Sequence, residues 1–286
     1  MGHPAVVSDS KMAIEWVKDS KGIDQIVLRN SRGASAKVVK APKVNRGGIA
    51  ICFPQFSNCG SLEQQGFARN KLWIVDEAPP PLPAKSSNGS SFIDLLLKPS
   101  EEDLKIWPHS FELRLRVCLG LNGNLTLTSR VRNINCKPFR FSFAYHSYLS
   151  VSDIGEVRVE GLETMDYLDN LSNKERFTEQ GDAITFEAEF DRVYLGSPNI
   201  VAVLDHERKR TYVIRREGLS DVVVWNPWDK KAKAMTDMGF DEYRRMVCVD
   251  GAVVANPITL KPGQEWTGRL DITVAPSSFY SEGLCF

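Results

Sequence analysis

The sequence predicts an all-β protein, built as a large antiparallel β-sandwich with few short helices. Many short apolar segments follow one another closely, and several alternate apolar with polar residues. A period of two buries one face of a strand, and a long succession of such strands is typical of a sandwich. We expect helices only near residues 230–245.

The clearest strand signal lies in the middle of the chain. Residues 111–121 read FELRLRVCLGL, and residues 125–134 read LTLTSRVRNI, with apolar residues at alternate positions. Asn122 and Gly123 lie between the two runs and favour a tight turn. The sequence therefore predicts a hairpin here, and residues 16–33 predict an earlier hairpin or edge strand.

Further strands are expected at VRVEGL (157–162), AITFEAEF (183–190), IVAVLD (200–205), TYVIRRE (211–217), DVVVW (221–225), RMVCVDG (245–251) and RLDITV (269–274). The segment PPPLPAKSSNGSS (79–91) predicts a loop between strands, because ordered structure resumes directly after it. We therefore expect residues 1–286 to form a single domain, with roughly the first 15 residues flexible.

Composition narrows the classes of function. Lys plus Arg and Asp plus Glu each number 36, so the chain lacks the basic excess typical of nucleic-acid binding. No apolar run has the length of a membrane span or a signal peptide. The six cysteines show no CxxC spacing, which favours reduced thiols over a metal site. These features predict a cytoplasmic protein that binds neither membrane nor nucleic acid.

Two residues are candidates for acid/base chemistry. In FRFSFAYHSYLSVSDI (139–154), His146 shares a strand face with polar and small residues, while Phe141, Phe143 and Tyr145 share the other face. Asp250 follows the apolar run 246–249 and precedes a glycine. The residues alone leave simpler roles open, a hydrogen-bonded strand histidine and an aspartate that begins a turn.

Other candidates suit the binding of a phosphate group or of a sugar ring. The stretch 46–70 contains Arg46 and Arg69 beside glycine turns, and a guanidinium pair can hold a phosphate. In VVVWNPWDKK, Trp225 and Trp228 lie on either side of Asn226 and Pro227, and such a pair could stack on a sugar face. Asp191 follows a predicted strand. Solvated arginines, core tryptophans and surface aspartates are the competing interpretations.

Five segments, RGGIAICFPQF, GFARN, YHSYLSVSDI, DRVY and VVVWNPW, resemble in this order the aldose 1-epimerase superfamily. They are most similar to its hexose-6-phosphate 1-epimerase branch, which includes plant apospory-associated protein C-like members. The resemblance implies the galactose mutarotase-like sandwich and a cofactor-free interconversion of the α and β anomers of a hexose 6-phosphate such as glucose 6-phosphate.

The resemblance also implies roles for residues. His146 matches the family's acid, and Asp250 matches its base, which is usually a glutamate. Arg46 and Arg69 match positions that hold the 6-phosphate, and Asp191 matches a residue that contacts sugar hydroxyls. We expect Trp225 and Gln65 to line the same site, without a metal or cofactor, in a monomeric protein.

The chain departs from the family at two places. Gln65 replaces the histidine of the usual HGFAR motif, and glutamine cannot carry a proton. The segment between Ala36 and Arg46 is short, which predicts a missing early strand and an exposed sheet edge. The alternatives are therefore a sugar-phosphate binding protein with weakened chemistry, or a mutarotase for sugars without phosphate.

Overall fold

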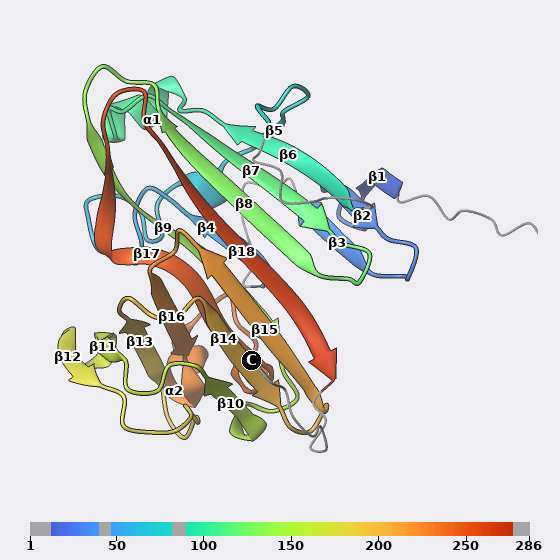
Figure 1. The fold of residues 1–286 in the computed structure, drawn as a ribbon, viewed down its shortest axis with the longest axis vertical. Coiled ribbons are helices and arrows are strands. Elements are labelled where there is room, and N and C mark those ends of the chain that lie inside the picture. Colours follow the sequence, from blue (N-terminus) through green and yellow to red (C-terminus); the bar gives the residue numbers. More distant parts are fainter. Residues whose placement is uncertain (1–12, 40–46, 82–89, 277–286) are drawn as a thin grey trace, which may run out of the picture.

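Two large antiparallel sheets and one small sheet make up the protein in this computed structural model, which describes residues 13–39, 47–81 and 90–276. The eight-stranded sheet has the order β10-β14-β15-β18-β8-β7-β6-β5, and the seven-stranded sheet has the order β12-β11-β13-β16-β17-β9-β4. Strands β1, β2 and β3 form the small sheet. The predicted antiparallel sandwich is confirmed (Figure 1).

The eight-stranded sheet contains β5 (Ile74–Val75), β6 (Ser91–Leu97), β7 (Phe111–Leu119), β8 (Leu125–Asn133), β10 (Val157–Glu160), β14 (Ile200–Asp205), β15 (Arg210–Glu217) and β18 (Glu265–Pro276). The seven-stranded sheet contains β4 (Ile49–Cys52), β9 (Phe139–Ser150), β11 (Asp166–Asp169), β12 (Glu175–Thr178), β13 (Phe190–Tyr194), β16 (Asp221–Asn226) and β17 (Met246–Leu260). The small sheet contains β1 (Ala13–Lys18), β2 (Asp24–Arg29) and β3 (Ser35–Val39).

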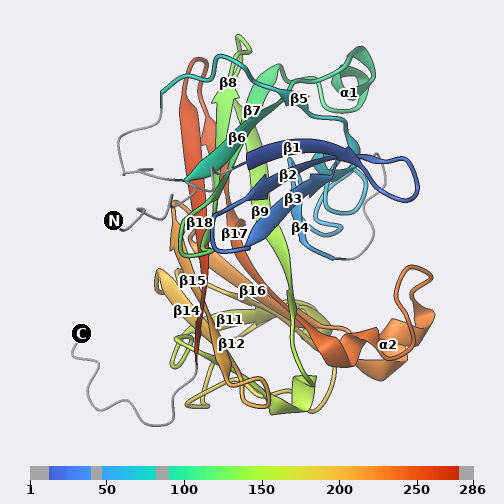
Figure 2. The ribbon, with the colours of Figure 1, turned by 90° about the vertical axis from the view of Figure 1, so that its right-hand side faces the viewer.

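Apolar side chains from both large sheets form one continuous core between them. The predicted hairpin is confirmed, because β7 pairs with β8 in a register that places Leu115 opposite Ser129. The small sheet adds Ile26 and Leu28 to the same core, and Figure 2 shows it crossing the upper half of the molecule. Strands β1 and β2 confirm the early hairpin predicted in 16–33.

The strand predicted at residues 183–190 is wrong. Only Ile184 makes a bridge, to Val159, and β13 begins at Phe190. Ile184 and Phe186 are nevertheless buried in the core. The alternating pattern therefore reports burial correctly, but the backbone between the two side chains has no continuous ladder partner.

Helices are short. Helix α2 (Trp228–Ala234) and the 3-10 turn η4 (Glu242–Arg245) lie where helices were predicted. Helix α1 (Glu101–Ile106) was not predicted, although Ser100 and Asp103 form a capping box at its start. Three further 3-10 turns are η1 (Ala68–Asn70), η2 (Ile154–Glu156) and η3 (Asn170–Ser172).

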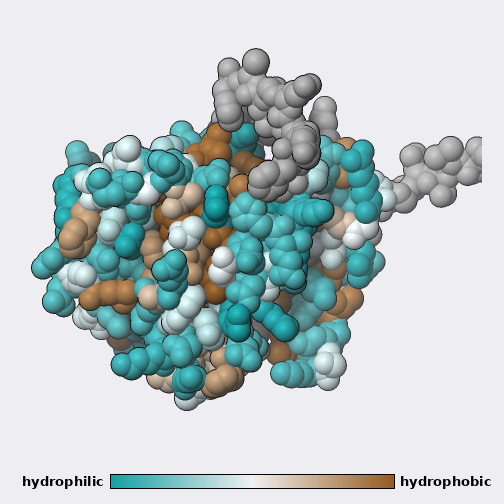
Figure 3. Space-filling view, turned by 90° about the horizontal axis from the view of Figure 1, so that it is seen from below, coloured by the Kyte–Doolittle hydropathy of each residue, from teal (hydrophilic) through white to brown (hydrophobic). Residues whose placement is uncertain are grey.

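Several expectations concern residues outside the described ranges, namely the N-terminal segment, Arg46 with the short stretch before it, and most of the proline-rich loop 79–91. Among the described residues, no helix has the length and apolar character needed to cross a bilayer. Figure 3 shows hydrophilic residues over most of one end of the molecule, with hydrophobic residues gathered toward the middle.

Candidate active site

Strands β9 and β17 bring the two acid/base candidates together. Their register pairs Cys248 with Tyr148 and Gly251 with Tyr145, which places Asp250 directly opposite His146. On β9 the neighbouring residues Phe143 and Tyr145 point into the core, so His146 points to the other face of the sheet. The face predicted for His146 is therefore confirmed.

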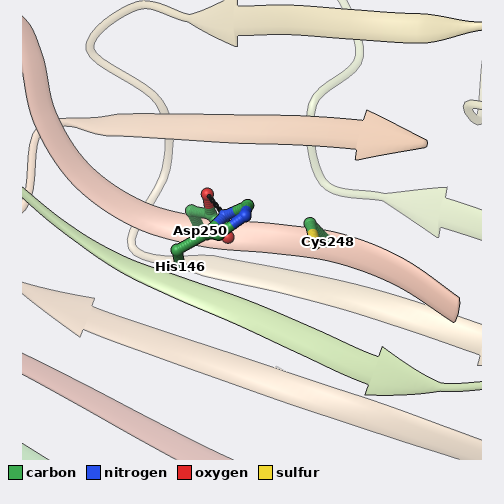
Figure 4. Close-up of side chains that lie close together, drawn as sticks. All are labelled: His146, Cys248 and Asp250. Atoms are coloured by element: carbon green, nitrogen blue, oxygen red, sulfur yellow. Dashed lines mark hydrogen bonds and ion pairs between the residues drawn. The ribbon is translucent and has the colours of Figure 1, made fainter. Parts of the chain in front are cut away.

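The two side chains are in direct contact (Figure 4). His146 Nδ1 lies 2.8 Å from Asp250 Oδ2, and the Ser147 backbone N–H donates to Asp250 Oδ1 over 2.8 Å. The exposed fraction is 0% for Asp250 and 7% for His146. A buried carboxylate with two donors is held in a fixed orientation, and it fixes the orientation of the histidine in turn.

Aromatic rings surround the other side of the histidine. His146 Nε2 lies 3.0 Å from the hydroxyl oxygen of Tyr148, and the two ring centres are 4.7 Å apart. The ring centre of Trp225 on β16 lies 5.9 Å from that of His146. Trp225 is thus next to the pair, whereas the nearby Trp228 packs against Tyr243 instead.

Asp191 reaches the same face from β13. Its backbone pairs with Trp225, and Trp225 pairs with Cys248, so Asp191 lies two strands away from β17. Asn170 Nδ2 donates to Asp191 Oδ1 over 2.7 Å. Burial raises the pKa of the Asp191 carboxyl above its usual value, against the lowering effect of the Asn170 hydrogen bond.

Arg69 lies in η1, next to strand β4. The backbone N–H groups of Phe67 and Ala68 both donate to the carbonyl oxygen of Phe53, which anchors the turn. Gly66 makes this approach possible, because its φ is +68° and a Cβ there would lie 2.3 Å from the Phe53 oxygen.

The Arg69 guanidinium has one N–H group, at Nε, that could donate a hydrogen bond to a ligand. Its Nη2 donates to the carbonyl oxygen of Gln64, while its buried Nε has no acceptor in the described part of the chain. Cys52 on β4 lies close enough to both Arg69 and Asp250 for their charges to affect its thiol. Burial and the charge of Asp250 raise the pKa of the Cys52 thiol, and Arg69 lowers it.

Gln65 holds its own loop together. Its side-chain oxygen accepts from the Ser57 N–H over 2.9 Å, and its backbone N–H donates to the Ser57 carbonyl oxygen. The amide nitrogen of the Gln65 side chain is the group that could donate to a sugar hydroxyl. The histidine of related motifs would need to replace this contact with Ser57.

Sequence reasoning missed Tyr148, Cys248 and Asn170. Tyr148 and Cys248 lie two residues from His146 and Asp250 respectively, and residues two apart on a strand share a face. That spacing was a usable signal. No sequence pattern indicates that Asn170 contacts Asp191, because the contact depends on how the turn after β11 folds against β13.

Two cavities border this part of the molecule. One, of about 390 Å³, is lined by Tyr148, Ser150, Met246 and Arg245 among others. The other, of about 260 Å³, lies beside β4, where Ala50, Arg69, Lys71 and apolar residues of β7 and β8 line it. Neither cavity is lined by His146 or Asp250. The candidate site is therefore defined by the contact between these two side chains.

An imidazole bonded to a buried carboxylate, with a second carboxyl on the same face of the sheet and an arginine next to strand β4, is an arrangement that can move protons on a bound polar molecule. The comparisons with known proteins specify the class of protein. The aldose 1-epimerase family model matches residues 14–273, and the chain belongs to this family.

Named relatives agree with this assignment. The chain is 55% identical to the "Putative glucose-6-phosphate 1-epimerase" of Cenchrus ciliaris, over 93% of this chain and 89% of the relative. The protein of the same name in Escherichia coli is 30% identical over 72% of this chain and 67% of its own length.

The fold also has a solved counterpart. The crystal structure of "a putative mutarotase (YeaD)" from Salmonella typhimurium matches with a TM-score of 0.78 and 23% identity, over 92% of this chain and 97% of that chain.

Proposed function

We propose that the protein is a hexose-6-phosphate 1-epimerase that interconverts the α and β anomers of glucose 6-phosphate or a related aldose phosphate. The family and the names of the relatives support this proposal. The observation that carries it is the His146–Asp250 contact, which provides a proton donor and a proton acceptor side by side.

The reaction needs two proton transfers at one carbon. The anomeric hydroxyl and the ring oxygen are both bonded to C1, so an acid and a base in contact can serve both oxygens. Asp250 takes the proton of the anomeric hydroxyl while His146 donates a proton to the ring oxygen, and the C1–O5 bond breaks. Rotation about C1–C2 and the reverse transfers close the ring as either anomer.

Asp250 is fully buried, and its Oδ2 is in contact with the histidine ring. For Asp250 to act as the base, the anomeric hydroxyl must replace His146 at Oδ2, while the Ser147 N–H continues to hold Oδ1. A glutamate, the family's usual residue, would be one methylene longer. The shorter aspartate therefore requires the sugar to come closer to the sheet, or the ring of His146 to shift.

Four further side chains are proposed to bind the sugar phosphate. Arg69, whose Nε lacks an acceptor in the described chain, would bind the 6-phosphate together with Arg46. Asp191 would bind a sugar hydroxyl, and Trp225 would pack against the sugar ring. Gln65 would add a hydrogen bond from its amide nitrogen. We propose that the enzyme acts in the cytoplasm as a monomer, without a cofactor.

Anomer-exchange NMR on glucose 6-phosphate and on glucose tests this function. We expect the protein to accelerate exchange of the phosphate sugar above the buffer rate, and His146→Gln to abolish the acceleration. His206→Gln, in the turn after β14, is the matched control and should retain activity.

Two results would overturn the proposal. Binding of glucose 6-phosphate without acceleration would indicate a catalytically silent sugar-phosphate binding protein. Equal acceleration of both sugars would indicate a mutarotase that does not recognise the phosphate.

A further inference from the structure

Three side chains of the types that ligate metals lie together on the face of β9 and β17 that points away from the main core. His146, Cys248 and Asp250 each offer one ligand atom, and these atoms all lie within 4.8 Å of one another. Cys248 shares the face because it is two residues from Asp250, as Figure 4 shows. The spacing of Cys248 from Asp250 is visible in the sequence, but the contact of both with His146 is not, because His146 and Asp250 are 104 residues apart.

We propose that His146, Cys248 and Asp250 form a binding site for a thiophilic divalent cation, with Zn²⁺ as the preferred ion. Imidazole nitrogen, thiolate sulfur and carboxylate oxygen are the ligand types that zinc takes in proteins. The thiolate selects against Mg²⁺ and Ca²⁺, which prefer oxygen ligands. The metal replaces the proton shared by His146 and Asp250, and the Cys248 thiol proton leaves to solvent.

The distances suit this exchange. Zinc bonds of about 2.0 Å to nitrogen and oxygen and about 2.3 Å to sulfur place tetrahedral ligand atoms roughly 3 to 4 Å apart. The His146–Asp250 separation of 2.8 Å would widen slightly when the metal replaces the proton. The longest separation in the cluster, at most 4.8 Å, would shorten by about 1 Å through side-chain rotation.

Neighbouring groups already orient two of the ligands. The Ser147 N–H holds Oδ1 of Asp250, which leaves Oδ2 for the metal, and hydrogen bonds of this kind to ligating carboxylates strengthen metal sites. The Tyr148 hydroxyl holds His146 at Nε2, so Nδ1 is the nitrogen that faces Asp250. With three protein ligands, a tetrahedral ion has one position left for water or for an oxygen of a ligand.

The consequence for activity rests on the proposed function. A metal bound to both His146 and Asp250 would remove the proton donor and the proton acceptor together, so Zn²⁺ would be an inhibitor. The metal site itself rests only on the geometry of the three side chains, and it can be tested without any measurement of catalysis.

Cobalt binding to the full-length protein provides that test, because Co²⁺ bound to a thiolate has a sulfur-to-metal charge-transfer absorption. We expect one Co²⁺ per chain with this absorption, displaced by Zn²⁺. Cys248→Ala should abolish the absorption, and Cys248→Ser serves if the alanine variant does not fold. Cys52→Ala is the matched control, since Cys52 is also fully buried and shares this face but lies outside the cluster.

The outcomes separate the two proposals. A charge-transfer absorption that is missing in the wild type, or that survives in both Cys248 variants, would overturn the metal site. Epimerase activity that Zn²⁺ inhibits in the wild type, and at least about tenfold less strongly in Cys248→Ala, would support both proposals. Metal binding by a protein whose metal-free form has no epimerase activity would leave the metal site standing and overturn the proposed function.

Discussion

Replacement of Asp250 by asparagine is the sharpest test of the acid/base pair. Asparagine keeps the shape of the residue and one oxygen to accept the Ser147 N–H, but its amide cannot take up a proton. The amide nitrogen would face Nδ1 of His146, which must then become an acceptor, and the ring proton would move to Nε2. The pair would lose its base and change its tautomer in one step.

The structure explains why asparagine is preferable to alanine here. Alanine would leave two buried donors without an acceptor, the Ser147 N–H and the Nδ1–H of His146, at a cost of about 1–3 kcal/mol each. The sum of about 2–6 kcal/mol is a large part of a typical stability of about 5–15 kcal/mol. Loss of activity in the alanine variant could therefore reflect unfolding.

For Asp250→Asn we expect kcat to fall by about 10²- to 10⁴-fold. This corresponds to about 2.7–5.4 kcal/mol in activation free energy. The assay is anomer-exchange NMR on glucose 6-phosphate, combined with a thermal unfolding measurement.

Asp221→Asn is the control, because Asp221 is also a buried aspartate that accepts two backbone N–H groups, those of Val254 and Ala255. It should lose stability and keep kcat. A folded Asp250→Asn protein whose kcat stays within about tenfold of wild type would refute the role of Asp250.

Three further predictions concern other residues. Arg69→Ala should lower kcat/KM for glucose 6-phosphate by about 10- to 100-fold, the value of a charge-assisted hydrogen bond, and equal losses on glucose would contradict a phosphate contact. Gln65→His should bring no gain in NMR exchange rate, because the glutamine oxygen is already bound to Ser57; a gain would show that a titrating group is missing. Burial would raise the pKa of Asp205, but the hydrogen bonds from Ser152 and the Arg208 N–H, together with the charge of Arg210, hold it below its usual value. The stabilisation by Asp205 is therefore present above the unfolded-state pKa of about 3.9 and is lost as pH falls through the lower folded-state pKa. Asp205→Asn should lower the free energy of unfolding at pH 7 by about 1–3 kcal/mol, the value of hydrogen bonds to a charged group, and should flatten its decline in acid. Urea unfolding at several pH values is the measurement.

The sequence predicted the sandwich because the alternating pattern of β7 and β8 is unambiguous, and Asn122–Gly123 supplies a turn between them. The same rule failed at residues 183–190, where Ile184 and Phe186 alternate toward the core without a strand ladder. Periodicity thus reports which side chains are buried. It does not report whether the backbone has a neighbour to bond with, since that depends on segments far away in the chain.

The candidate site was predictable to a similar extent. The alternation of β9 identifies the face on which His146 lies, and the resemblance to a family supplies Asp250, but neither gives their direct contact. That contact depends on the register between β9 and β17, which the core fixes. On the inner face, Tyr145 is fully buried and bonds to Ser129 and Gly268, so a shift of β9 would break these buried hydrogen bonds.

A slip of one residue would also send His146 into the core and Tyr145 to the open face. The same packing that stabilises the sandwich therefore positions the acid/base pair. Gly251 supports this arrangement, because a Cβ at that position would lie 2.9 Å from Leu219 and 3.1 Å from Arg216. The residue after Asp250 must be small for β17 to lie close to the buried side chains beneath it, and the position of the carboxylate follows from how closely β17 packs.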